Sequence, residues 1–141
     1  MTPETLAALH ARAFPGPPRA WTAEEFASFL SDPAVSILTA ADAFLVTRRA
    51  GPEAEVLTLC TAPEARRMGQ ARALMTQFET EAEAADVEEI FLEVAETNVA
   101  ARALYAALGY SQRGHRKDYY SQGGRQHVHA YVLSKPLRPR G

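Results

Sequence analysis

The chain has 141 residues, which is enough for one domain of ordinary size with a single hydrophobic core. Its net charge of −2 offers no general attraction to nucleic acid or to an anionic membrane, so neither partner is predicted. The start has no signal-sequence pattern and no apolar run approaches the roughly 18 residues of a membrane span, so we expect a cytoplasmic protein. Its single cysteine agrees with a reducing compartment.

The first third of the chain predicts two helices and a β-hairpin. Residues 3–13 carry apolar side chains at helical spacing, and the proline-rich segment 14–18 ends that helix. Residues 22–25, with the sequence TAEE, form a capping box that begins a second helix. Two strand-like runs, 35–39 and 43–47, then predict the hairpin.

The middle of the chain alternates strands and helices. The apolar run 56–60 predicts a strand, and residues 71–85 place apolar side chains on one stripe of a long helix. Residues 90–94 form a continuous apolar run, typical of an inner parallel strand, and an alanine-rich helix over 97–108 should end at Gly109. A strand, a helix and a second strand in this order predict a parallel pair joined by a crossover.

The last part of the chain is strand-like on both sides of a polar segment. The chain is strand-like from residue 110, residues 117–125 are expected to separate two strands, and 126–133 form the last one. We expect residues 134–141 to be a frayed tail. The predicted fold class is mixed α/β (α+β), with residues 1–141 as a single domain around one sheet.

The start of the long helix has an unusual charge distribution. A helix N-terminus favours acidic side chains, yet Arg66, Arg67 and Arg72 gather here. An anionic ligand would offset this arrangement, and Gly69 with the small Ala71 lets the backbone bend closely around a phosphate. The alternative is an ordinary strand-to-helix turn with solvated arginines. No GxxxxGK[ST] or GxGxxG motif is present, so neither a nucleoside triphosphate nor a dinucleotide is indicated.

Two side chains are candidates for proton transfer. Glu93 lies inside an apolar strand, so it either faces a cavity and serves as a general base or ends the strand in solvent. Tyr105 shares a helix face with Asn98 and Arg102, and its phenol could protonate a leaving thiolate. A tyrosine packed in the core is the alternative.

Other reactive residue types have weaker support. Cys60 lies in an apolar strand, where a lone cysteine usually packs rather than acts as a nucleophile. His127 and His129 share a strand face but have no third ligand in the sequence pattern, so no metal is predicted. His10 has no companion motif.

The pattern Arg66-x-x-Gly69-x-Ala71 resembles the acetyl-CoA pyrophosphate loop of the GCN5-related N-acetyltransferases (GNAT). Residues 92–94, Asn98 and residues 103–110 are similar to the second motif block of that superfamily. The resemblance implies the GNAT fold, a mixed sheet with a splayed central parallel pair at 57–61 and 90–94, flanked by helices.

The likeness extends to one subfamily, the RimI-type ribosomal-protein alanine N-acetyltransferases. Residues 13–15 with Trp21 and Phe26 are similar to its N-terminal block, and residues 116–120 resemble its RRNYY-type stretch. In all, the resemblance covers most of residues 13–133. Ala71 stands where glycine is commoner, and Ser121 stands where proline often follows the two tyrosines.

The resemblance implies a role for each matching residue. It makes Glu93 the general base for the substrate amine and Tyr105 the acid for the leaving thiolate of CoA. It assigns acetyl-CoA to the backbone of the strand end and to the loop: Leu59, Cys60, Thr61, Arg66, Arg67, Met68, Gly69, Gln70, Ala71 and Asn98. The implied acceptor is the N-terminal alanine of a small-subunit ribosomal protein, attacked directly and without a covalent enzyme intermediate. A GNAT enzyme for a small amine and an acetyl-CoA-binding regulatory module are the alternatives.

Overall fold

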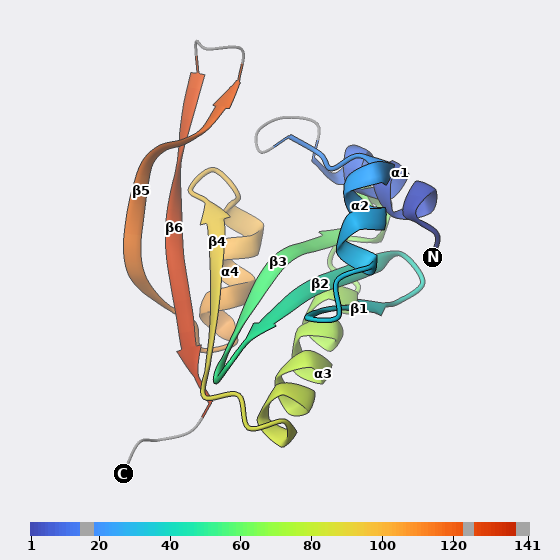
Figure 1. The fold of residues 1–141 in the computed structure, drawn as a ribbon. Coiled ribbons are helices and arrows are strands. Elements are labelled where there is room, and N and C mark those ends of the chain that lie inside the picture. The colour runs from blue at the N-terminus through green and yellow to red at the C-terminus, as the bar shows by residue number, and fades with distance from the viewer. Residues whose placement is uncertain (15–18, 123–125, 138–141) are drawn as a thin grey trace.

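The computed structural model describes residues 1–14, 19–122 and 126–137, with the backbone alone for 115–128. Within these residues one six-stranded sheet has the order β1-β2-β3-β4-β6-β5 (Figure 1). The strands are β1 (Val35–Thr39), β2 (Ala43–Ala50), β3 (Glu53–Thr61), β4 (Glu89–Ala95), β5 (Ser111–Gln122) and β6 (Gln126–Pro136). The helices are α1 (Pro3–Ala13), α2 (Ala23–Leu30), α3 (Gln70–Ala84) and α4 (Val99–Ala107), with a 3-10 turn η1 (Pro63–Ala65).

Local signals account for the ends of the helices. The predicted capping box is present at α2, where the Glu25 amide donates to Thr22 Oγ1 (3.1 Å) and the Thr22 amide donates to Glu25 Oε1 (3.0 Å). Gly109 follows α4 with a φ of +95°, the left-handed conformation that favours glycine. These predictions from short sequence motifs are confirmed.

The central parallel pair separates part of the way along its length. β3 and β4 pair from Glu53 and Glu89 to Val56 and Leu92, and beyond that point no further pairs join the two strands in the described chain. A register shift against β2 leaves Leu57 as an extra residue in β3, which is a β-bulge. Figure 1 shows β3 turning away from β4 above their shared lower end. The expected splayed pair is therefore confirmed, and the bulge lies where the separation begins.

Each face of the sheet is covered by a different pair of helices. Leu74 of α3 and Tyr105 of α4 belong to one buried cluster with Leu45, Val56 and Leu92. The second cluster joins α1 and α2 to the opposite face; its helix members are Leu6, Leu9, Ala13 and Phe26, and its strand and loop members are Phe44, Val46, Cys60, Ala62 and Ala65. Residues from the two clusters alternate along the first half of β2, so this part of the strand is buried on both faces between the two helix layers.

The C-terminal expectations need two corrections. β5 continues as a strand to Gln122, so most of the polar segment 117–125 extends the strand instead of separating two strands. The frayed tail was also placed too early, because β6 runs to Pro136 and Ser134 is buried between β4 and β5 partners. The Leu137 amide then donates to the carbonyl of Glu88 (2.8 Å). Residues 15–18, 123–125 and 138–141 lie outside the described residues.

None of the described helices combines the length and the hydrophobicity that crossing a lipid bilayer requires.

Candidate active site

The separation of β3 from β4 leaves one edge of β3 without a strand partner from Leu57 to Thr61 in the described chain. On its other edge this part of β3 pairs with β2. Leu59 packs against the α3 and α4 layer, whereas Cys60 is buried on the α1 and α2 side. Since these side chains point to the two faces, the backbone groups are left to bond an extended ligand along the edge.

Cys60 is a packing residue in this structure. Its side chain is 1% exposed, and Sγ lies 3.7 Å from the carbonyl oxygen of Leu9 in α1. Burial raises the pKa of the Cys60 thiol to about 12, so the reactive thiolate is not formed at neutral pH. The predicted contribution of Cys60 is therefore confined to its backbone.

The loop after β3 bends twice through the left-handed region before α3 begins. Arg67 has a φ of +68° and Gly69 a φ of +81°. Gly69 is the N-cap of α3 and no side chain caps this end, so the first amides of the helix remain available to an anion. A β-carbon at Gly69 would meet no atom within 4 Å, so the space beside the loop is open.

Arg66 in this loop and Gln70 at the start of α3 hold the loop against neighbouring segments. Arg66 Nη2 donates to the carbonyl of Ala13 at the end of α1 (3.2 Å). Gln70 Oε1 accepts from the amide of Asp42 (2.8 Å) in the β1–β2 turn. Arg67 and Met68 are exposed, and Met68 keeps 71% of its surface accessible. The loop is thus held from outside while its tip faces solvent.

Glu93 lies in β4 directly after the last residue paired with β3. It does not end the strand, because β4 continues to Ala95 and Glu93 pairs with Val132 of β6. Leu92 and Val94 are buried under α3 and α4, so strand alternation puts the half-buried Glu93 on the opposite face, the one that α1 and α2 partly cover. One of the two alternatives for Glu93, a position at the strand end, is therefore excluded.

Tyr105 and Asn98 come from α4. Tyr105 is 5% exposed and belongs to the core cluster on the face opposite Glu93, and its ring lies edge-on to Tyr110, with centroids 5.8 Å apart. Asn98 is the N-cap of α4, and its Oδ1 accepts from the amide of Ala101 (3.2 Å). The second lone pair of Oδ1 and the two N–H donors of Nδ2 are the groups with which this side chain would contact a cofactor.

Four contacts that the sequence did not reveal join α1 to the strand end and the loop. They are Leu9 O to Cys60 Sγ, His10 to Thr58 Oγ1, Arg12 to Glu64, and Ala13 O to Arg66. His10 occupies the apolar stripe of α1, four residues after Leu6, and this polar residue on a buried face was the only sequence signal. The helix therefore lies against the segment that the resemblance assigns to acetyl-CoA.

The chain belongs to the acetyltransferase (GNAT) family, whose model matches residues 6–110. It is 33% identical over 96 residues to the [ribosomal protein bS18]-alanine N-acetyltransferase of Escherichia coli K12. That match covers 67% of this chain and 64% of the relative, less than two thirds of its length. The Salmonella typhimurium LT2 protein of the same name is 34% identical over 105 residues, covering 71% of this chain and 69% of the relative.

The three-dimensional structure is also similar to that of a solved enzyme of this kind. The crystal structure of the ribosomal-protein-S18-alanine N-acetyltransferase from Escherichia coli has a TM-score of 0.83 to this structure at 27% sequence identity. The alignment covers 96% of this chain and 87% of the E. coli chain. Both the predicted fold class and the resemblance to the RimI-type enzymes are thus confirmed.

Proposed function

We propose that the protein transfers an acetyl group from acetyl-CoA to the N-terminal alanine of a small-subunit ribosomal protein. The observation that carries the proposal is that β3 and β4 stop pairing after Val56 and Leu92. This leaves one edge of β3 without a strand partner in the described chain, and Glu93 lies directly beyond the last pair. The names of the relatives support the alanine acceptor. A ribosomal acceptor would place the reaction in the cytoplasm, and one domain would carry the whole site.

Acetyl-CoA is proposed to bind along β3 and at the start of α3. The backbone of Leu59, Cys60 and Thr61 would pair with the pantetheine arm as an added strand does. Residues 66–71 would hold the pyrophosphate, and Asn98 would add a contact. The free edge of β3 and the open space beside Gly69 support this placement, since both features leave room for such a ligand.

Proton transfer at either end of the reaction is proposed for two side chains. Glu93 would take a proton from the α-amine through water, which is a modest task because an α-amine has a pKa of about 8 against about 10.4 for lysine. The amine nitrogen then forms a bond to the acetyl carbon, and the carbon–sulfur bond breaks. Tyr105 would donate its phenolic proton to the departing thiolate.

The proposal is tested by measuring CoA release with three acceptors in parallel. They are a peptide with the N-terminal sequence of a bS18 protein starting at alanine, the same peptide with a blocked N-terminus, and a panel of polyamines. Turnover that needs the free alanine supports the proposal. Turnover on polyamines alone would replace the acceptor, and no turnover on any acceptor would favour a binding module.

Glu93→Gln tests the base. It should lower kcat on the peptide by about 100-fold or more, the usual contribution of a positioned acid or base. Glu81→Gln, on the exposed surface of α3, is the matched control and should leave kcat unchanged. Equal rates for the two variants would remove Glu93 from the mechanism.

A further inference from the structure

His10 is a buried titratable residue for which the proposed chemistry has no use. It lies in α1 with 2% of its surface exposed. The amide of Trp21 donates to Nδ1 (2.9 Å), so Nδ1 is an acceptor and the ring proton belongs on Nε2. Nε2 lies 3.0 Å from Thr58 Oγ1 and therefore donates to that hydroxyl. One neutral ring thus joins two segments that are far apart in the sequence.

The surroundings of the ring keep it neutral. The aromatic rings of Phe14, Trp21, Phe26 and Phe44 have centroids 4.7 to 6.2 Å from that of His10. Burial lowers the pKa of His10 to about 4, although the Glu25 carboxylate acts in the opposite direction. At neutral pH His10 therefore has one donor and one acceptor, and both are used.

One end of this connection lies beside the proposed acetyl-CoA strand. Thr58 directly follows the bulge at Leu57, in the part of β3 that has left β4. It directly precedes Leu59, the first residue whose backbone is proposed to pair with pantetheine. A bond to the Thr58 side chain therefore fixes the orientation of the strand edge that the ligand would use.

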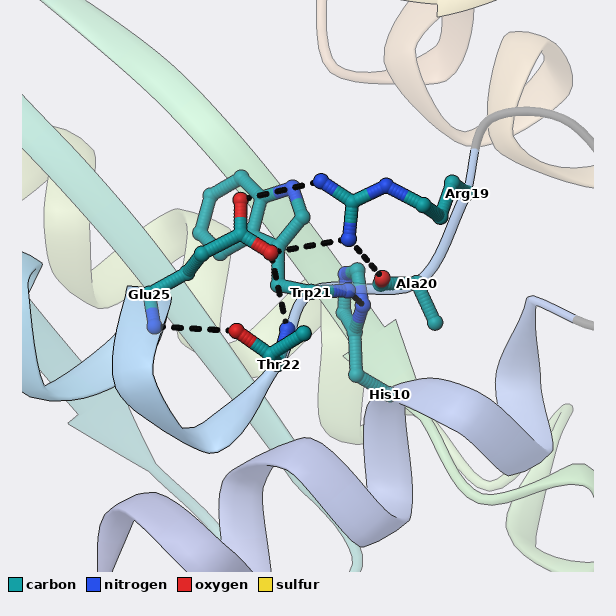
Figure 2. Close-up of polar contacts among 6 residues, drawn as sticks. All are labelled: His10, Arg19, Ala20, Trp21, Thr22 and Glu25. Carbon is teal, nitrogen blue, oxygen red and sulfur yellow. Dashed lines mark hydrogen bonds and ion pairs between the residues drawn. The ribbon is translucent and has the colours of Figure 1, made fainter.

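The other end lies in the connection that enters α2. Arg19 donates to the carbonyl of Ala20 (2.9 Å) and to both carboxylate oxygens of Glu25 (2.8 and 3.1 Å). Glu25 also accepts from the Thr22 amide, so residues 19–22 form one braced segment with Trp21 inside it (Figure 2). We call residues 19–22 the entry segment.

The entry segment belongs to the α1 and α2 layer, which covers the face of the sheet that also has Glu93. Phe26 and Cys60 are buried together between the helices and the sheet, on the face that also has Glu93. An amine that gives its proton to Glu93 must approach on this face, beside α1 and α2. The segment is thus on the acceptor side, whereas Thr58 is on the cofactor side.

We propose that His10 is a positioning residue that couples the acetyl-CoA strand to the entry segment, so that acetyl-CoA bound at β3 strengthens binding of the acceptor. This inference rests on the proposed function. A coupling of this kind is reciprocal and typically changes affinity by about 5-fold or more. Loss of the Thr58 hydroxyl should cut the connection at its cofactor end.

Trp21 is the only tryptophan of the sequence, so its fluorescence reports on the entry segment alone. Acetyl-CoA should change the Trp21 emission saturably in the wild-type protein. Thr58→Val should still bind acetyl-CoA by calorimetry but show less than a third of the emission change. Thr58→Ser, which restores a hydroxyl, should recover the wild-type response. Thr80→Val, at an exposed threonine whose hydroxyl donates to the Thr76 carbonyl on α3, is the matched control.

The second measurement is the dissociation constant of the alanine-terminated peptide with and without CoA. The wild-type ratio should be about 5 or more, close to 1 in Thr58→Val, and restored in Thr58→Ser. A full emission response and an unchanged ratio in folded Thr58→Val would overturn the coupling. So would acetyl-CoA binding to the wild type without any emission change. Absence of calorimetric binding to the wild type would instead contradict the proposed function, and the coupling with it.

Discussion

Each face of the sheet has buried polar side chains near the candidate site. His10 of α1 has hydrogen-bond partners on both ring nitrogens. On the other face, the phenols of Tyr105 and Tyr110 are buried in the core beneath α4, where burial and the nearby Glu79 raise the pKa of Tyr110. Burying a polar group costs free energy unless the group is hydrogen-bonded, so the role of each of these side chains can be tested directly.

Tyr105→Phe separates a proton donor from a core tyrosine, because the ring and its packing are kept. If Tyr105 protonates the thiolate, kcat should fall by about 100-fold while the melting temperature changes little. Tyr110→Phe removes the neighbouring buried hydroxyl and should leave kcat within about twofold. Steady-state rates of CoA release compare the two variants, and equal kcat values would assign Tyr105 to the core alone.

The lowered pKa of His10 makes stability depend on pH. Between the unfolded pKa of 6.5 and the folded value of about 4, the unfolded chain binds the extra proton, so stability is lost as pH falls through this window. The loss attributable to His10 should reach about 2 kcal/mol at pH 5. The lowered pKa of Glu25, about 2, acts in a separate window: its stabilisation is lost only below about pH 4.5.

Urea unfolding at pH 7 and pH 5 measures this loss. His10→Asn keeps an acceptor for the Trp21 amide but has no titrating ring, so its stability should fall less than that of the wild type between the two pH values. An identical fall in both proteins would mean that His10 does not titrate in this range.

The three helices near the site differ in how their ends are fixed. α1 runs beside the outer part of β3, α2 begins at the capping box that Arg19 extends, and α3 begins at Gly69 without a side-chain cap. An uncapped N-terminus with arginines nearby is poorly satisfied without an anion. The loop before α3 is therefore the element where a ligand should have the largest effect.

Gly69→Ala tests this loop. Alanine is strained at a φ of +81°, which should cost about 1 kcal/mol of stability, and it adds a methyl group where a phosphate would approach. The dissociation constant for acetyl-CoA should rise by about 10-fold or more. Gly51→Ala is a matched control, since Gly51 has a φ of +61° and equally open surroundings in the β2–β3 turn. It should lose similar stability at unchanged affinity, and equal affinity losses would contradict the assignment.

Across the full sheet, the parting of β3 and β4 leaves backbone groups unpaired in the described structure. A ligand that binds this edge only in the folded state should stabilise the protein by mass action. At a concentration 100 times its dissociation constant, acetyl-CoA should add about 2.7 kcal/mol, or roughly 5–10 °C in melting temperature. Differential scanning calorimetry measures this shift, with acetyl-pantetheine, which lacks the pyrophosphate, expected to give less.

Much of the fold follows from patterns within a few residues. The capping box at Thr22, the left-handed Gly109 and the apolar stripe of α3 were predicted correctly because each depends on neighbours within one or two helical turns. Part of β5 (Ser111–Gln122) reads as a polar connection in the sequence because its residues are polar, and pairing with β6 overrides that composition. The roles of the candidate site residues stay predictions.

The motifs around Gly69 and Glu93 indicated the family and predicted a phosphate loop and a carboxylate base without any coordinates, since a glycine-containing loop and a carboxylate in an apolar strand are local features. The bulge at Leu57, the point where β3 leaves β4 and the bonds of His10 could not be predicted in this way. Thr58 is 48 residues from His10, and their contact exists only because α1 packs on β3. Such contacts depend on register and packing between distant segments, and these are decided when the whole core forms.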